Sequence, residues 1–242
     1  MKKSRKLSIW SIAILTMAPA LYWGCGGDDD DAGVNNPDIA VCDPANGPFS
    51  TDITNPYFPV IVGSKSVLEG PEEGATIRIE VTPLGETQVI AGVTARVREE
   101  REYSDGVLFE VSRNFFVQAT DGTVCYYGED VDEYDPTGKV LGHSGSWRAG
   151  ENGNKPGIQM AAHPAVGMSY DQEVAIGVAQ DHGDVTSMGD SITVPFGTYT
   201  DTLTIEETSV VEPGTMSLKQ YAKDVGVIGD ETYKLISYTP AP

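Results

Sequence analysis

The clearest pattern in the chain lies at residues 93–128, which read VTARVREEREYSDGVLFEVSRNFFVQATDGTVCYYG. Apolar and polar side chains alternate here, and a period of two places one set on each face of a β-strand. The runs are interrupted at Ser104-Asp105-Gly106 and at Asp121-Gly122, and the second of these suits a two-residue hairpin loop. The stretch therefore predicts three antiparallel strands joined by two turns.

The strand between these turns has two chemically different faces. Phe109, Val111 and Phe115 share one face, and Glu110 and Asn114 share the other. Small-molecule pockets are mostly apolar with a few placed polar groups. We therefore expect the face with Phe109, Val111 and Phe115 to supply any ligand pocket.

Strand patterns of this kind recur over most of the remaining chain. The 27 Gly and 15 Pro fall mostly between β-rich runs, and no helical period occurs after residue 25. Residues 151–167 lack a sustained period and predict a long ordered loop. We predict an all-β fold whose antiparallel meanders form a curved, partly closed sheet or a barrel-like sandwich, since such a shape hides sheet edges.

The second half of the chain echoes the first. Each half contains a strand ending in Glu-Glu (Glu99-Glu100 and Glu206-Glu207), then a return strand with an aromatic residue before an alanine, then a short glycine turn. This order suggests a duplicated meander, with halves at about 63–148 and 167–242. The alternative is that all antiparallel meanders share this order of strands and turns, without any duplication.

The N-terminus has the pattern of a targeting segment. Residues 1–24 hold a basic start and a hydrophobic run from Leu7 to Leu21, shorter than the roughly 20 residues of a membrane-spanning helix. Cys25 follows, then Gly-Gly and four aspartates, which resembles the start of a mature bacterial lipoprotein. The resemblance implies a signal peptide at 1–24, a lipid on Cys25, and anchoring in the bacterial cell envelope, with sorting to the outer membrane.

Ordinary signal cleavage is the alternative for this segment. Ala18-Pro19-Ala20 matches an A-x-A site. Cleavage after Ala20 would leave Cys25 as a free thiol in a secreted or soluble periplasmic protein.

Residues 25–50 are acidic, rich in Gly, Asn and Pro, and poor in apolar residues. This composition predicts a flexible tether, which leaves residues 51–242 as a single all-β domain. Cys42 lies in the tether and Cys125 at the end of the central meander. In an oxidising compartment these two cysteines predict a disulfide, with pairing between molecules as the alternative.

The net charge of −20 bears on the partners of the protein. Affinity for nucleic acid depends on Lys and Arg that neutralise phosphates. We therefore expect no nucleic-acid partner.

A cluster of acids near residue 130 is the main candidate for a metal site, and Asp181 and Asp184 form a smaller cluster. Asp130, Asp132 and Asp135 supply hard oxygen ligands of the kind that calcium prefers. Their spacing is not that of an EF-hand loop, and a solvated acidic turn is the alternative. We expect no other cofactor.

Catalytic residues are hard to assign from this sequence. All three histidines, His143, His163 and His182, fall within residues 142–184, but no hydrolase motif accompanies them. The first hypothesis is a non-catalytic binding module for an apolar or amphipathic, lipid-like ligand or for an envelope protein. The alternatives are a structural or assembly lipoprotein without a small ligand, and a secreted hydrolase with its site in loops 142–184.

Overall fold

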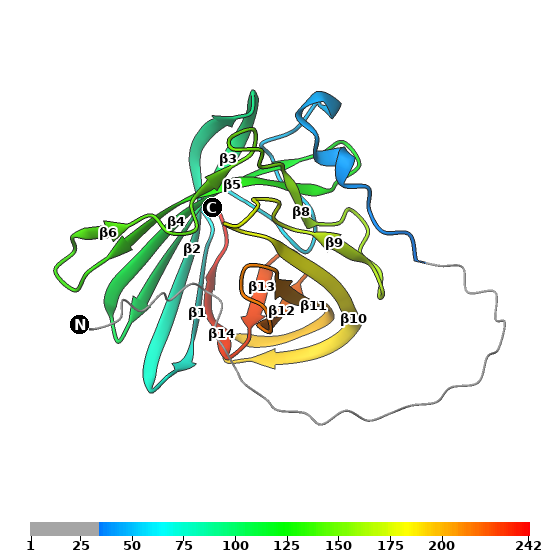
Figure 1. The fold of residues 1–242 in the computed structure, drawn as a ribbon. Helices are drawn as coiled ribbons and strands as arrows, with labels where there is room; N and C mark the ends of the chain where they lie inside the picture. Colours follow the sequence, from blue (N-terminus) through cyan, green and yellow to red (C-terminus); the bar gives the residue numbers. More distant parts are fainter. Residues whose placement is uncertain (1–33) are drawn as a thin grey trace, which may run out of the picture.

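The computed structural model describes residues 34–242. This part of the chain forms one antiparallel sheet of fourteen strands, which curves strongly but is not closed into a barrel (Figure 1). The predicted all-β class of antiparallel meanders is confirmed. The signal segment, Cys25 and the cleavage site after Ala20 lie outside the described residues.

The strand order along the sheet is β6-β5-β4-β3-β2-β1-β14-β13-β12-β11-β10-β9, and β7 and β8 pair with β5 off this path. Two short 3-10 helices, η1 (Ile39–Cys42) and η2 (Pro44–Asn46), precede the sheet. The strands are β1 (Lys65–Glu72), β2 (Ala75–Ile90), β3 (Val93–Ser104), β4 (Val107–Gln118), β5 (Val124–Tyr134), β6 (Val140–Gly142), β7 (Trp147–Arg148), β8 (Gly157–Met160), β9 (Ser169–Asp171), β10 (Asp181–Val194), β11 (Gly197–Ser209), β12 (Met216–Ala222), β13 (Gly226–Asp230) and β14 (Tyr233–Thr239).

The central meander forms β3, β4 and β5 as predicted, but β5 continues beyond Gly128. Gly128 has a φ of 132°, and a Cβ there would lie 2.3 Å from the carbonyl oxygen of Trp147. Only glycine allows β7 to approach the strand this closely. The backbone therefore runs through the glycine as one long strand.

Two four-strand meanders, β2–β5 and β10–β13, lie in the same sheet and are joined through the β1–β14 pair. The glycine turn expected in the second half, Val225-Gly226-Val227, does not form only a turn, because Gly226 begins β13. Both echoed stretches are thus strand meanders, while a duplication of one from the other stays a prediction.

The segment around β8 and the segment after β9 approach each other, but no continuous run of strand hydrogen bonds joins them. A Cβ on Gly157, in β8, would lie 2.1 Å from the carbonyl oxygen of Gln172, just after β9. The backbone of Lys155 also forms a bridge with Val174. The segment predicted as a loop at 151–167 therefore contains a strand, β8, which pairs with β5 and lies against the residues just after β9.

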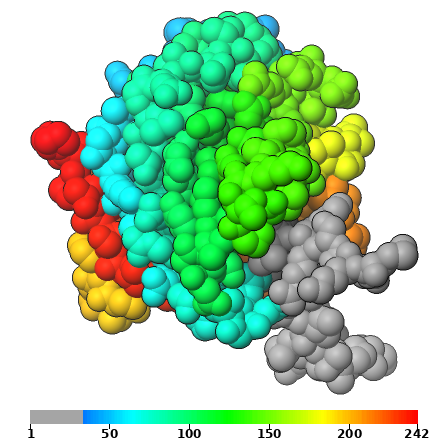
Figure 2. Space-filling model, turned by 90° about the vertical axis from the view of Figure 1, so that its left-hand side faces the viewer, coloured from blue at the N-terminus to red at the C-terminus, as the bar shows by residue number. Residues whose placement is uncertain are grey.

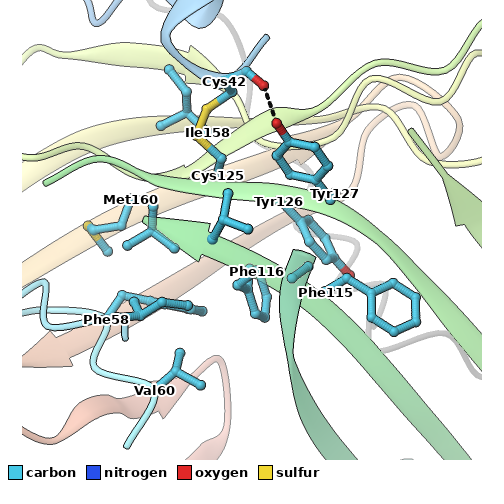
Figure 3. Packing of buried hydrophobic residues seen from close by; sticks show 14 of the residues in the cluster. Cys42, Phe58, Val60, Phe115, Phe116, Cys125, Tyr126, Tyr127, Ile158 and Met160 are labelled. Atoms are coloured by element: carbon cyan, nitrogen blue, oxygen red, sulfur yellow. Dashed lines mark hydrogen bonds between the residues drawn. A yellow bond between two sulfur atoms is a disulfide. The ribbon is translucent and has the colours of Figure 1, made fainter. Parts of the chain in front are cut away.

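The segment before the sheet is tied to it. Cys42 and Cys125, the predicted pair, form a disulfide with a Cα–Cα distance of 5.5 Å. The Tyr127 hydroxyl donates to the carbonyl oxygen of Cys42 at 2.7 Å (Figure 3), and Ser50 pairs with Gln118 through the backbone. The predicted tether up to residue 50 is therefore corrected: residues 39–50 pack on the sheet, because the disulfide and these bonds hold them.

Apolar side chains gather in two clusters. The larger surrounds Phe115, Phe116 and Tyr127, and the smaller surrounds Ile79 and Ile228. Strands β2 to β5, cyan to green, form a continuous face, with the C-terminal residues in red beside them (Figure 2). Within residues 34–242, no helix is long and apolar enough to span a bilayer.

Candidate ligand-binding site

The curved sheet encloses two adjoining chambers. The first, the apolar chamber, encloses about 880 Å³ including space open to solvent. Its apolar walls come from the segment before β1 and from β1, β2 and β13. These wall residues are Phe58, Pro59, Ile61, Leu68, Ile79, Val81, Pro83, Val225 and Val227.

The second chamber, the acidic chamber, encloses about 560 Å³ on the same basis. Its carboxylates come from β5, from the segment after β9, and from β10 and β11. These are Glu129, Glu173, Asp181 and Glu207. Ser112, Asn114, Phe116, Tyr126 and Gln172 also line it.

Four residues line both chambers and form the waist between them: Arg98, Glu100, Gln159 and Lys219. Arg98 forms an ion pair with Glu100, and its guanidinium lies 4.5 Å from the Phe58 ring centroid. Lys219 pairs with Glu207 across 2.7 Å. Both cations of the waist are therefore held by carboxylates of the same chambers.

Strand alternation explains why these charges point inward. On β3, Arg98 and Glu100 occupy alternate positions that line the chambers, whereas Glu99 and Arg101 occupy the other face. There Glu99 accepts from Arg101 at 2.6 Å and pairs with Arg113 at 3.1 Å. Each face of the strand thus has its own ion pairs.

Asn55 holds the segment that carries Phe58 into the apolar chamber. The Asn55 side chain is 3% exposed, and its amide donates to the carbonyl oxygens of Gly122 and Ala161 at 3.1 and 3.0 Å. Its own oxygen accepts from the Tyr57 backbone N–H at 3.0 Å. A buried polar side chain needs such partners, and here they fix the chamber wall.

The acids of the acidic chamber have shifted pKa values. Burial, together with the nearby Glu110 and Glu100, raises the pKa of Glu129 to about 8. Burial and a hydrogen bond with Asp181 raise the pKa of Glu173 well above its usual range, although the Trp147 indole N–H donates to Glu173 at 3.3 Å. Desolvation disfavours the charged form, so burial favours the protonated form of both groups.

The environment of Lys219, in the waist, favours the charged form of its side chain. Burial alone would lower the pKa of Lys219, but Glu207 and Asp230 outweigh it and raise that pKa well above its usual range. Gln172 also donates to Glu207 at 2.8 Å. Lys219 therefore stays charged beside a carboxylate that is 1% exposed.

The pocket uses the face of β4 that the sequence did not suggest. None of Phe109, Val111 and Phe115 lines either chamber, whereas Ser112 and Asn114 of the polar face do. Phe115 instead packs in the larger core cluster, which includes Cys42 of the segment that covers the sheet. The face that was expected to supply a pocket therefore lines neither of the two chambers.

The sequence contained one signal for the actual site. The repeated Glu-Glu pairs were expected to end two strands, but they lie inside β3 and β11, which continue to Ser104 and Ser209. Glu100 and Glu207 from these pairs meet in the acidic chamber. The partners of these acids, Arg98 and Lys219, gave no such signal. Nothing in a single sequence indicates which strands face each other across a cavity.

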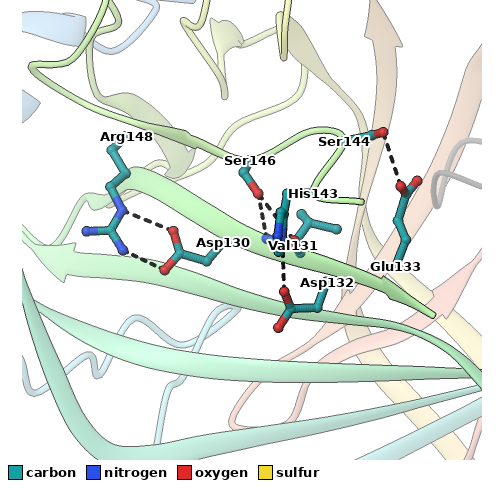
Figure 4. A network of polar contacts seen from close by, with 8 residues as sticks. All are labelled: Asp130, Val131, Asp132, Glu133, His143, Ser144, Ser146 and Arg148. Atoms are coloured by element: carbon teal, nitrogen blue, oxygen red, sulfur yellow. Dashed lines mark hydrogen bonds and ion pairs between the residues drawn. The ribbon is translucent and has the colours of Figure 1, made fainter. Parts of the chain in front are cut away.

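The three residues predicted to bind calcium each have a partner on the outer side of β5 or in the turn after it. Arg148 holds Asp130, with Nε 3.0 Å from Oδ1, and His143 Nδ1 lies 2.9 Å from Asp132 Oδ1 (Figure 4). Asp135 accepts from the Thr137 backbone N–H at 2.8 Å. Within residues 34–242, no group of three or more His, Cys, Asp or Glu is arranged to hold a metal ion. Calcium at these residues stays a prediction.

The structure separates the three histidines. His143 lies beside β5, His163 is exposed, and His182 lies on β10. His182 Nε2 is 2.6 Å from the Ser169 hydroxyl, and its Nδ1 is 2.7 Å from Asp171 Oδ1. This serine–histidine–aspartate arrangement joins β9 to β10, on the face opposite to Asp181.

Comparison with protein-family models, with curated proteins and with solved structures finds no match. The class of protein is therefore defined by its fold and site alone. It is an all-β chain with a two-chambered interior pocket, apolar on one side and acidic on the other.

Proposed function

We propose that this chain is an exported, lipid-anchored envelope protein that binds an amphipathic small molecule without transforming it. The observation that carries the proposal is the direct contact between an apolar chamber and a charged one through the shared waist. A ligand with an apolar body and a polar head matches this division. Pockets of this kind combine apolar walls with a few placed polar groups.

Export and anchoring are supported by two independent features. The signal-like segment and Cys25 resemble a lipoprotein N-terminus, and the Cys42–Cys125 disulfide suits an oxidising compartment. Cys25→Ser is expected to move the full chain from the membrane fraction to the soluble fraction. A wild-type protein that is already soluble would favour cleavage after Ala20.

Native mass spectrometry of the full chain tests the binding proposal. We expect extra mass that survives purification and extracts into organic solvent. Ile79→Trp fills the apolar chamber and should remove this mass, whereas Val89→Trp, on an exposed part of the same strand, should retain it. Circular dichroism checks that both variants fold, and Val81→Phe is the milder filling variant.

A bare polypeptide mass in the wild type and in Val89→Trp would overturn the pocket proposal. Mass that EDTA removes would instead indicate a metal, for which Asp130, Asp132 and Asp135 are the predicted ligands. A stable complex with an envelope protein, without a small ligand, would favour the structural or assembly role.

The serine–histidine–aspartate arrangement favours hydrolysis as a second candidate function. Ser169, His182 and Asp171 have the hydrogen-bonded order of a nucleophile, a base and an orienting acid. However, the Ser169 hydroxyl also donates to Asp184 at 2.6 Å, which competes for the same proton. His182 and Asp171 are also partly exposed and line neither chamber.

A fluorophosphonate probe tests this candidate directly. Covalent labelling that is lost in Ser169→Ala and retained in Ser187→Ala would support a catalytic serine. Ser187 is the matched control, because it lies on β10 and is bonded to Asp190, away from His182. Absence of labelling in the wild type would exclude this function.

A further inference from the structure

We infer that the ligand is an amphipathic amine, whose ammonium head is held by Glu129, Glu173 and Asp181 while its apolar tail occupies the apolar chamber. The inference rests on the proposed function, because it names the chemistry of the ligand for the same pocket. It follows from a comparison of the basic and acidic side chains that line the two chambers.

The cations of the pocket are already paired. Arg98 is held by Glu100, and Lys219 lies 2.7 Å from Glu207. No other Lys, Arg or His lines either chamber. Both basic side chains that line the chambers therefore already form ion pairs with carboxylates at the waist.

Three carboxyl groups of the acidic chamber remain, and a further one, Asp230, lines the apolar chamber and is 7% exposed. Within residues 34–242, none of Glu129, Glu173 and Asp181 has a Lys, Arg or His nitrogen within 4.0 Å. Asp181 is 4% exposed, and all three come from different segments that converge on one chamber. Buried carboxylates are costly unless a cation or hydrogen-bond donors compensate them.

Glu129 and Glu173 reduce this cost without a ligand by protonation, since burial raises the pKa of Glu129 to about 8 and that of Glu173 well above its usual range. An ammonium group in the chamber would allow both carboxyls to ionise. Binding of a cation should therefore release protons from the protein. A neutral or anionic head would gain no such stabilisation.

The walls of the acidic chamber also suit a cation. Phe116 and Tyr126 line it and stack with their ring centroids 4.7 Å apart. Aromatic faces attract ammonium groups, most strongly where water is excluded. Aromatic rings and carboxylates together form the kind of environment in which proteins hold organic cations.

A second, independent observation points to a polar ligand atom near the waist. The Tyr221 hydroxyl is fully buried and lines the apolar chamber, and among residues 34–242 it has no hydrogen-bond partner. A buried, unpaired hydroxyl is unfavourable. An amine whose tail carries a hydroxyl or amide group close to the waist would supply the missing partner, whereas a purely hydrocarbon tail would not.

Three probes with the same chain and different heads test the inference: octylamine, octanol and octanoate, titrated calorimetrically into the full chain. We expect octylamine to bind at least about tenfold more tightly than octanol, and octanoate to bind most weakly, since charge-assisted pairs are the stronger ones. Titration in two buffers of different ionisation enthalpy should show proton release with octylamine only.

Variants locate the head group. Glu173→Gln and Glu129→Gln should each weaken octylamine binding by about tenfold and leave octanol binding unchanged. Glu86→Gln, at an exposed position on β2, is the matched loss of one negative charge and should change neither.

The possible failures are distinguishable. If octylamine and octanol bind equally well, the pocket remains and the ammonium head is wrong. If octylamine prefers the protein but the Glu129 and Glu173 variants keep full affinity, the head lies elsewhere and the assignment is overturned. If none of the three probes binds and no ligand co-purifies, the proposed function fails with it.

Discussion

Strand β5 carries carboxylates on both faces, and their surroundings differ sharply. On the outer face, Arg148 holds Asp130 and His143 holds Asp132 (Figure 4). Glu129, one residue earlier in the chain, faces the acidic chamber and, among residues 34–242, has no cationic partner within 4.0 Å. One continuous acidic stretch thus divides into paired and unpaired groups.

The difference arises from what the facing elements supply. Outside, the return of the chain through β7 places Arg148 beside Asp130. Inside, the elements across the chamber contribute further acids, Asp181 from β10 and Glu207 from β11. The outer acids have partners within the protein, and so does Glu207 in Lys219. Glu129 and Glu173 have no such cation, and burial raises the pKa of both.

The largest expected effect comes from breaking the inner ion pair. Lys219→Met leaves Glu207 buried without its cation at 2.7 Å. Removal of one partner from a buried pair costs about 3–5 kcal/mol. We expect the free energy of unfolding, measured by urea titration, to fall by that amount.

The double variant Lys219→Met with Glu207→Gln is the control. It removes both charges, and replacement of a whole buried pair by neutral groups is often nearly neutral for stability. Most of the loss should therefore be recovered. A double variant as unstable as the single one would show that lost packing of Lys219, and not the stranded charge, dominates.

The second expected effect is a dependence of stability on pH. Burial, then Glu133 and Glu100, raise the pKa of Glu110 to about 8. Between pH 4.5, the usual pKa of a glutamate, and pH 8, the folded protein keeps this proton and the unfolded chain releases it. The free energy of unfolding should therefore be highest below pH 4.5 and should fall as pH rises to 8, by up to about 1.4 kcal/mol per pH unit for this group.

Urea titrations at pH 5, 6, 7 and 8 measure this slope. Glu110→Gln should flatten it, because the amide cannot titrate, and the variant should be more stable than the wild type at pH 8. Glu86→Gln controls for loss of one surface charge. Equal slopes in the wild type and in Glu110→Gln would mean that Glu110 is ionised in the folded protein. Glu102, paired with Glu110 across the strands and 3% exposed, contributes in the same direction.

Much of the fold was predictable because it depends on local patterns. The alternation at 93–128 and the glycine turns determine β3, β4 and the start of β5. The sequence did not reveal that β5 continues through Gly128, because the close approach of Trp147 is a long-range contact. Nor did the composition of residues 25–50 indicate that their second half packs on the sheet.

The site was far less predictable, for a physical reason. Alternation separates two faces of a strand but does not say which face the curved sheet encloses. On β4 the apolar face is used for the core around Phe115, and the polar face with Asn114 lines the chamber. Enclosed polar side chains look like ordinary solvent-facing ones in a single sequence. Only the convergence of Glu100 and Glu207 was indicated by a feature of the sequence, the repeated Glu-Glu pairs.

The smallest expected effect is on the outer face. Asp130→Asn removes the ion pair with Arg148. The side chain of Asp130 is 48% exposed and that of Arg148 is 31% exposed. Exposed pairs contribute about 0–1 kcal/mol, and salt screens them over a Debye length of about 3 Å at 1 M. We expect a loss below about 1 kcal/mol in low salt, which disappears in 1 M NaCl.

Arg148→Met separates the charge from the packing at this outer site. The guanidinium of Arg148 also lies 5.2 Å from the Phe115 ring centroid, and that contact survives in Asp130→Asn but not in Arg148→Met. The arginine variant should therefore lose more, by about 0.5–1 kcal/mol, and the difference should persist in high salt. If Asp130→Asn destabilised the protein as much as Lys219→Met, the outer pair would be as poorly screened as the inner one. The contrast between the two faces of β5 would then concern geometry alone, and the unpaired inner acids would no longer be a reason to expect a cationic ligand.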